Sequence, residues 1–320
     1  MNIRNILSIY TKLQSSPLSQ QYLQKCYESL DVDAERKSYD NTYRLIYYLE
    51  HGQTFYKQAE ESPLSVQPIL YFYGMAQFIK AAILTQRPDY PESTSVLAHG
   101  VTSRKRKKQN YSFLQDEVKI QNKGLFSYVS EHMFHMEHFP KEKFTMDELL
   151  RRIPEMKEIY GFLDTPSNGY PIGHKDGKVL TIPISILDDY HWSENYFKQH
   201  IHSILPECEE IKIEQHSIKV LVTSPISTIH NPYLYVNHED EQLFIPNQRS
   251  LQYPLPELLS HYLILYNLSM LSRYETEWWG DILHSYTSED LVYIRTFLEI
   301  SKTKIPWLIA DFLASHVTKN

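Results

Sequence analysis

The chain has 320 residues and a net charge of −7, with 42% hydrophobic and 22% charged residues. These proportions are typical of a globular protein and argue against extensive disorder. The acidic balance argues against a protein whose main task is to coat nucleic acid. Only 9 glycines are present, so the glycine-rich loops of common nucleotide enzymes are nearly excluded.

Cysteine content and hydropathy indicate the cellular compartment of the protein. Cys26 and Cys208 lie far apart, which predicts neither a disulfide framework nor a cysteine-based zinc site. The sequence has no uninterrupted run of about 18 apolar residues, and its first apolar stretch is too short for a secretory signal. We therefore expect a cytoplasmic protein without a membrane segment.

Helical periodicity dominates the first part of the chain. A helical stretch is predicted from 18 to 58, with His51-Gly52 as a local stop or bend. A clearer helix is predicted from Ile69 to Leu84, after Pro68. Tyr73 and Lys80 share one face of this helix because they are two turns apart.

The middle of the chain has a different pattern. Between 159 and 250, β-branched and aromatic residues alternate or cluster between turns, which predicts an antiparallel β-rich region. Its strands are expected at Val179–Ile186, Glu210–Glu214, Ser217–Thr223, Tyr233–Asn237 and Gln242–Pro246. Helical spacing at Ser193–Leu205 makes this region α+β rather than all-β.

The last part of the chain returns to helical spacing. The predicted helices cover 257–274, 278–286, 288–300 and 306–317, the last of them starting at Pro306. The expected fold is therefore α+β, with helical N- and C-terminal parts around an antiparallel β-rich middle. We expect an N-terminal helical region with a basic loop (1–158), a β-rich region (159–250) and a C-terminal helical region (251–320) that packs with the N-terminal part.

The strongest local charge signal is a run of five cations: Arg104, Lys105, Arg106, Lys107 and Lys108. Consecutive cations can bind phosphates and gain affinity through counterion release, and the aromatic residues Tyr111 and Phe113 follow closely. A solvated loop without a ligand is the competing interpretation. Arg273 is a separate cation at the end of a very apolar helix, where it can cap the helix or pair with a buried carboxylate.

Histidines supply the most conspicuous metal-like pattern. His132, His135 and His138 are spaced by three residues, but the first and last would be separated by roughly 240° around a helix. One helix cannot direct all three at one ion. We therefore predict no metal site, and no other feature predicts a cofactor.

Motifs for covalent or acid–base catalysis are missing from the sequence. No Gly-x-Ser-x-Gly nucleophile elbow occurs, and neither cysteine has a catalytic context. The acidic pairs Asp188-Asp189 and Glu209-Glu210 are sequence neighbours, whose side chains diverge. No catalytic residue is predicted.

Several segments resemble the YaaC-like family of bacilli. The segments that carry the resemblance are Tyr71–Ala82, Ala98–Val101, the basic run, Gly124–Phe126, Leu268–Tyr274 with Trp278, and Ile305–Leu308. They span nearly the whole chain. The family supplies no activity to transfer. Its genes tend to lie beside one for guanine-nucleotide synthesis, so the resemblance implies an enzyme of that synthesis as a partner.

A more distant resemblance is to HEPN helical domains. The order Tyr73, Met75, Lys80, Ala81 and His99 is similar to the core pattern of those domains. HEPN ribonucleases use an Arg followed, after four to six residues, by a His, and we assign no such pair to this chain. The resemblance thus implies a HEPN-like bundle that serves as a binding scaffold.

These observations favour a non-catalytic binding or regulatory protein that recognises a cytoplasmic protein partner or a nucleotide. The expected binding residues are His99, Arg104, Lys105, Arg106, Lys107, Lys108, Tyr111, Lys80 and Arg273. The alternative is a HEPN-like RNA-binding protein or ribonuclease. A small-molecule enzyme also stays open, because a site assembled from distant residues leaves no local motif.

Overall fold

The computed structural model describes residues 3–103, 112–163, 168–229, 231–285 and 288–315. The chain divides into two compact units. Unit 1 combines residues 1–146 with 261–320, and unit 2 comprises residues 147–260. The expected α+β fold is confirmed, because helices dominate both ends of the chain and the small sheets are antiparallel.

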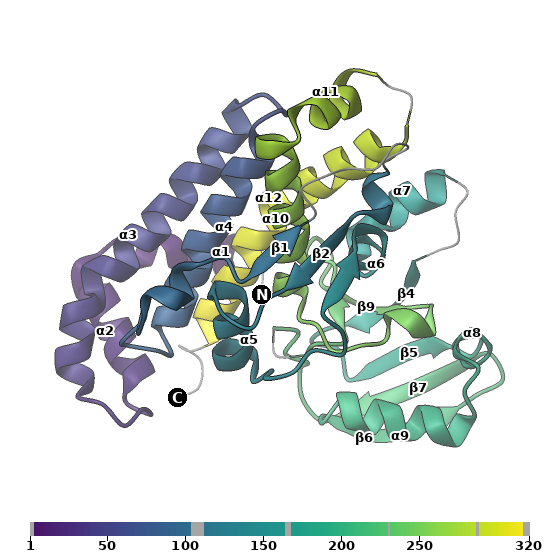
Figure 1. The fold of residues 1–320 in the computed structure, drawn as a ribbon. Coiled ribbons are helices and arrows are strands. Elements are labelled where there is room, and N and C mark those ends of the chain that lie inside the picture. The colour runs from purple at the N-terminus through teal and green to yellow at the C-terminus, as the bar shows by residue number, and fades with distance from the viewer. Residues whose placement is uncertain (1–2, 104–111, 164–167, 230, 286–287, 316–320) are drawn as a thin grey trace. The chain divides into compact units, whose positions relative to one another are not determined.

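Unit 1 is a helical assembly with one small sheet (Figure 1). Its helices are α1 (Ile3–Lys12), α2 (Ser16–Tyr27), α3 (Ala34–Glu61), α4 (Gln67–Leu84), α5 (Leu125–Phe134), most of α10 (Glu257–Tyr274), α11 (Thr276–His284) and α12 (Asp290–Ser315). Its strands are β1 (Val101–Ser103), β2 (Glu117–Ile120) and β3 (Lys143–Thr145), in the order β1-β2-β3. Helices from the two ends of the chain pack together, α12 against both α1 and α4.

Unit 2 holds the other two sheets. Its helices are α6 (Met146–Leu150, from Asp147 on), α7 (Lys157–Phe162), α8 (Ile186–Tyr190) and α9 (Glu194–Ile204). Its strands are β4 (Gly169–His174), β5 (Val179–Pro183), β6 (Cys208–Ile213), β7 (Ser217–Val222), β8 (Tyr235–Val236) and β9 (Gln242–Pro246). They form the sheets β4-β9-β8 and β5-β7-β6.

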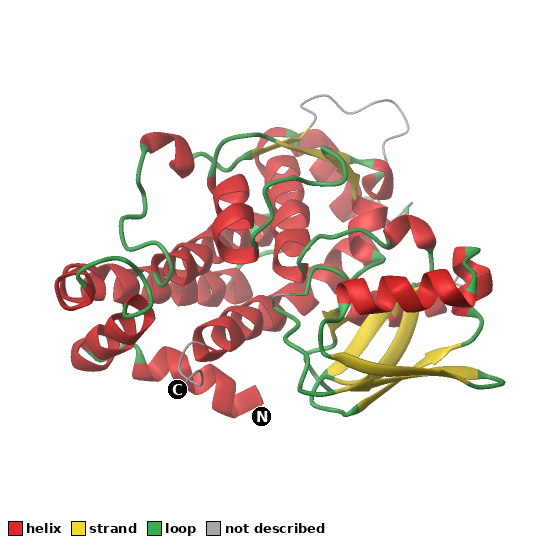
Figure 2. Ribbon diagram, turned by 90° about the horizontal axis from the view of Figure 1, so that it is seen from below, coloured by secondary structure: helices red, strands yellow, loops and turns green. Residues whose placement is uncertain are grey.

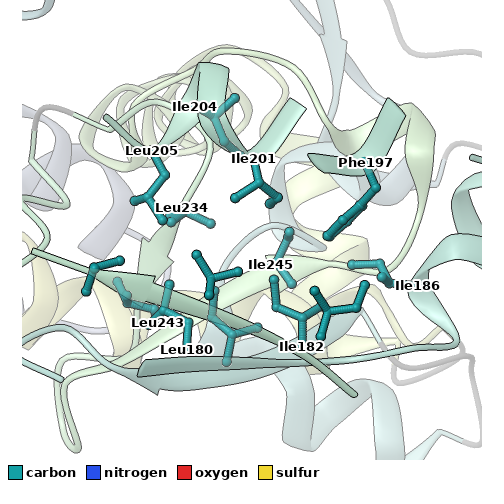
Figure 3. Close-up of a cluster of buried hydrophobic side chains, with 14 of the residues drawn as sticks. Leu180, Ile182, Ile186, Phe197, Ile201, Ile204, Leu205, Leu234, Leu243 and Ile245 are labelled. Carbon is teal, nitrogen blue, oxygen red and sulfur yellow. The ribbon is translucent and has the colours of Figure 1, made fainter. Parts of the chain in front are cut away.

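The core of unit 2 forms between α9 and the strands. Phe197, Ile201 and Ile204 recur on one face of α9 and are buried, as helical spacing requires. Figure 3 shows these side chains facing Leu180 and Ile182 of β5, Leu234, and Leu243 and Ile245 of β9. Figure 2 shows the corresponding helix lying across the strands. The alternating burial of β5 explains its strand pattern in the sequence.

A buried arginine holds the chain segments of unit 2 together. Arg152 is 1% exposed and donates hydrogen bonds to the carbonyls of Tyr253 (2.7 Å), Pro232 (2.8 Å) and Leu255 (3.1 Å). Its guanidinium lies 4.6 Å from the ring centroid of Tyr235 and 4.3 Å from that of Tyr253. Carbonyl dipoles and aromatic faces thereby compensate the buried charge.

The expected stop at His51-Gly52 is wrong, because α3 continues to Glu61. Gly52 lies inside the helix, and a Cβ there would be 2.5 Å from the Phe78 ring of α4. Gly74 of α4 similarly lies against the Tyr56 ring of α3, where a Cβ would be 2.6 Å away. Both glycines therefore allow close packing of α3 against α4, which run side by side in Figure 1.

The prediction of separate helices at 288–300 and 306–317 is also wrong. Helix α12 runs from Asp290 to Ser315 with Pro306 inside it. Proline removes one helical hydrogen bond, but Ile305, Trp307 and Leu308 are buried beside it. Tertiary packing therefore keeps the helix continuous across the proline.

Two glycines hold the segment 98–100 against the start of α5. Gly100 and Gly124 have φ angles of 77° and 125°, in the region that favours glycine. A Cβ on Gly124 would lie 2.4 Å from the Gly100 Cα. The N–H of Leu125 donates to the carbonyl of Ala98 at 2.7 Å, so the segment caps α5.

None of the helices in the described residues combines the length and the apolar character that a membrane span requires.

We expect Gly124→Ala to lower the free energy of unfolding by roughly 3 kcal/mol, because the new Cβ is strained by the backbone φ and collides with Gly100. Urea unfolding followed by circular dichroism measures the change. Gly280→Ala is the matched control: no atom lies within 4 Å of its new Cβ, and helical propensity predicts a gain of about 1 kcal/mol. Equal stability of the two variants would contradict the packing argument.

Candidate functional site

The predicted basic run cannot be placed. Arg104, Lys105, Arg106, Lys107, Lys108 and Tyr111 lie outside the described residues, so their binding role stays a prediction. Phe113, expected as an adjoining aromatic of this surface, is fully buried, and its N–H donates to a carboxylate oxygen of Asp290 at 3.0 Å. Phe113 is therefore a core residue.

The structure fixes His99 by its backbone. The His99 carbonyl accepts hydrogen bonds from the Phe126 N–H (3.2 Å) and from the Tyr262 hydroxyl (2.9 Å). The neighbouring Gly100 carbonyl accepts from the Gln121 N–H at 2.9 Å. These contacts join the Ala98–Val101 and Gly124–Phe126 motifs, which are distant in sequence, and they leave the His99 side chain free to point elsewhere.

The His99 ring is half-buried among aromatic rings of α4 and α10. Its centroid lies 4.9 Å from that of Phe72, 5.8 Å from that of Tyr266 and 6.1 Å from that of Tyr73. The ring nitrogens form no hydrogen bond with any residue that the structure describes. They therefore remain available for a ligand.

Two further predicted site residues are Arg273, which contacts Tyr73, and Lys80, which lies two turns from Tyr73 on α4. Arg273 Nη1 donates to the Tyr73 hydroxyl at 3.0 Å, and Arg273 Nε donates to the Ser269 carbonyl at 3.1 Å, so this side chain caps the end of α10. Lys80 lies on the same face of α4 as Tyr73, and its Nζ is 6.0 Å from the centroid of the Tyr48 ring.

Both cations affect the pKa of His99. Burial lowers the pKa of His99 below its ordinary value, and the charges of Arg273 and then Lys80 lower it further. Burial also lowers the pKa of Lys80. Lys80, His99 and Arg273, predicted from separate parts of the sequence, are thus brought together by the fold.

The positive charge of this cluster is not neutralised. Neither Lys80 nor Arg273 forms an ion pair with a carboxylate among the described residues, although both are half-buried. Elsewhere in unit 1, cations such as Lys37 and Lys119 are paired, with Asp89 and Glu142. Electrostatics therefore favours an anion over a cation at this surface.

Helix α3 contributes one edge of the site. The residues at this edge were not among the predicted site residues. Phe55 stacks on Tyr73 with ring centroids 6.2 Å apart, and the exposed His51 contacts Phe55 at 6.1 Å. Arg44 is exposed and donates to the Tyr90 carbonyl at 2.9 Å. The spacing of Arg44, His51 and Phe55 places them on one side of a helix, and this spacing is the signal in the sequence that could have identified this edge.

We call this surface the cationic aromatic face. It consists of Arg44, Tyr48, His51, Phe55, Tyr73, Lys80, His99 and Arg273.

The assignment of no HEPN-type Arg–His pair to the chain is wrong. Arg44 and His51 are separated by six residues, which matches the spacing of that element. They lie two turns apart on α3, both exposed and on one side of the helix. The cationic aromatic face therefore includes an exposed guanidinium and an exposed imidazole.

A surface pocket adjoins His99 on its other side. The pocket has a volume of about 580 Å³ and is lined by residues 98–102 and 119–123 and by Glu142. Lys119 is paired with Glu142 at 3.0 Å, whereas Lys123 is exposed and has no carboxylate partner among the described residues. His99 thus belongs both to the lining of this pocket and to the cationic aromatic face.

The three regularly spaced histidines of the sequence do not lie on one helix. Helix α5 ends at Phe134, and His135 follows in the left-handed conformation with φ 53°, so His132 and His138 do not share a helix. Elsewhere in the described residues, the potential ligand atoms of His174, Asp176 and Glu241 lie within 4.8 Å of one another. Lys175 Nζ is 3.0 Å from a Glu241 oxygen, and this ammonium competes with a cation.

We expect Arg273→Met to raise the pKa of His99 more than Lys80→Met does, because removal of a nearby positive charge favours the protonated imidazole and the larger electrostatic effect comes from Arg273. NMR titration of the imidazole resonances measures both shifts. No change in either variant, or the reverse order, would show that the three side chains are not clustered as described.

The comparisons with known proteins concern the whole chain and not the site alone. No curated protein and no solved structure is significantly similar to the sequence. The resemblance to HEPN domains is not confirmed by these comparisons. The profile of the YaaC-like protein family matches residues 11–313, which include unit 2, most of unit 1 and all residues of the cationic aromatic face. The chain therefore belongs to the YaaC-like protein family.

Proposed function

We propose that this protein is a binding or regulatory protein whose unit 1 recognises a nucleotide at the cationic aromatic face. The observation that carries the proposal is the pair of half-buried cations near His99, Lys80 and Arg273, which have no carboxylate partner among the described residues.

The composition of the chain makes unpaired cations unexpected. The chain has 39 acidic and 32 basic residues, so carboxylates are more numerous than cations. Partial burial of a cation costs solvation free energy, which an ion pair normally offsets. An acidic chain that leaves two neighbouring half-buried cations unpaired is arranged for an anion from outside. Phosphate is the anion that an Arg and a Lys together bind best.

The aromatic residues indicate what the phosphate is attached to. Tyr274 is 64% exposed, and the Arg273 guanidinium lies 5.1 Å from its ring centroid. An exposed ring next to a guanidinium can stack with a nucleobase while the guanidinium binds a phosphate. Tyr48 offers a similar ring beside Lys80. A nucleotide combines the two chemical groups that this surface accommodates.

The regulatory part of the proposal concerns the partner. The family resemblance implies an enzyme of guanine-nucleotide synthesis as the partner. A protein that binds a nucleotide would respond to the product of such an enzyme. Arg104 to Lys108, which follow directly after β1, are the proposed contact with an acidic surface of that partner.

We expect the purified full chain to bind GMP or GTP, and the double variant Lys80→Met/Arg273→Met to lose about 100-fold or more in affinity, because two charge-assisted hydrogen bonds are removed. Isothermal titration calorimetry measures both.

The matched control is Lys25→Met/Arg295→Met, which removes the same charge from exposed positions of α2 and α12. This control should bind like the wild type. Equal affinities of the two double variants, or no binding of any nucleotide by the wild type, would refute the proposal.

A second candidate function rests on Arg44 and His51. An exposed imidazole can transfer protons during phosphodiester cleavage, and a guanidinium can stabilise the charge on the phosphate. Both groups lie on the cationic aromatic face, so RNA would meet the same cations as a nucleotide. The favoured reaction class is metal-independent RNA cleavage.

If this second function is present, His51→Ala should lower the rate of cleavage of a labelled RNA by about 10² to 10⁴, the usual effect of losing a general acid or base. His284→Ala, at an exposed position on α11, is the control and should cleave at the wild-type rate. RNA that stays intact with the wild-type protein would exclude the function.

A further inference from the structure

The outward side of α3 exposes large aromatic residues. Tyr39, Tyr43 and Tyr47 are 71%, 59% and 59% exposed, and the rings of Tyr43 and Tyr47 lie 6.0 Å apart. They lie on the side of the helix away from Gly52 and the other buried residues of α3. Adjacent exposed aromatic residues of this kind are typical of an interaction surface.

The residues in line with Tyr43 and Tyr47 follow alternating steps of four and three. The line, which we call the outer stripe of α3, consists of Arg36, Asp40, Tyr43, Tyr47, Glu50, Thr54, Lys57 and Glu61. All eight are exposed. Steps of four and three keep side chains on one seam of a helix, which is the spacing used when two helices pack along their length.

When two copies of the outer stripe run antiparallel, the charges at the two ends of one stripe lie opposite charges of the other sign. From the N-terminal end the stripe begins with Arg36 and Asp40, and it ends with Lys57 and Glu61. In an antiparallel pair of stripes, Arg36 lies opposite the partner's Glu61, and Asp40 lies opposite the partner's Lys57. Two-fold symmetry repeats both pairs, so four ion pairs flank a centre in which Tyr43 lies opposite the partner's Thr54 and Tyr47 opposite the partner's Glu50.

We propose that the outer stripe of α3 binds the outer stripe of a second copy of this chain, as an antiparallel two-fold dimer. The mixed charge favours a second copy over a nucleic acid, because Asp40, Glu50 and Glu61 would repel phosphates. The cationic aromatic face lies on another side of α3 and stays available in this dimer. The proposal does not depend on the nucleotide-binding function.

Contacts within one chain do not compete strongly with this arrangement. Arg36 and Asp40 approach each other at 3.9 Å, with side chains 78% and 55% exposed. An exposed pair of this kind contributes little, so each side chain can turn to a partner. Asp40 and Lys57 are separated by about 25 Å along the helix, since each residue adds about 1.5 Å, and they cannot pair within one copy.

A charge exchange tests the proposal. Sedimentation equilibrium should show a dimer for the full-length wild type, and Asp40→Lys and Lys57→Asp should each weaken dimerisation about tenfold or more, because each places like charges together at two symmetric positions. The double variant Asp40→Lys/Lys57→Asp should restore near-wild-type dimerisation, since it exchanges the partners of both pairs.

Two controls separate the interface from general effects. Glu277→Lys changes the charge of an exposed residue on α11 by the same amount as Asp40→Lys and should leave the dimer unchanged. Circular dichroism should show the wild-type helix content for every variant, because the altered residues are exposed. A monomeric wild type at all concentrations, or a double variant no better than the single ones, would overturn the proposal.

Discussion

The close approach of Gly100 and Gly124 is the constraint on which the candidate site depends. It lets the carbonyls of Ala98 and His99 cap α5, so the backbone on both sides of the His99 side chain is immobilised. Tyr262 adds a hydrogen bond from α10 to the same segment. A larger residue at either glycine would separate these segments, and the imidazole would lose its fixed position among the rings of α4 and α10.

The site combines features that oppose stability. Lys80, His99 and Arg273 are partly removed from water and near one another, and the lowered pKa values of His99 and Lys80 are the cost of that arrangement. Because the folded state disfavours the protonated imidazole, stability should fall as the pH drops below the ordinary pKa of histidine, about 6.5. Such a cost is typical of a functional site. Arg152 of unit 2 shows the contrasting case of a buried cation that donates to three carbonyls and contacts two aromatic rings.

Helix α3 connects the two proposals because its sides have different chemistry. One side packs on α4, where Gly52 and Gly74 allow close contact. A second side carries Arg44 and His51 to the cationic aromatic face, and the third carries the outer stripe with charges of both signs. A 28-residue helix has room for all three functions, since its surface turns through a full circle every 3.6 residues.

The amino-acid sequence by itself determined the α+β class, the middle-region strands β5 to β9 and the shared face of Tyr73 and Lys80, because each of these follows from local periodicity. Strand β4 was not predicted. The sequence also singled out His99 and Arg273, but as isolated residues. Only the tertiary structure decided that they meet at Tyr73, that Gly52 serves packing and that α12 passes through Pro306. The physical reason is that each outcome depends on residues distant in the sequence: the Phe78 ring on α4 explains Gly52, and buried neighbours outweigh the missing hydrogen bond of the proline.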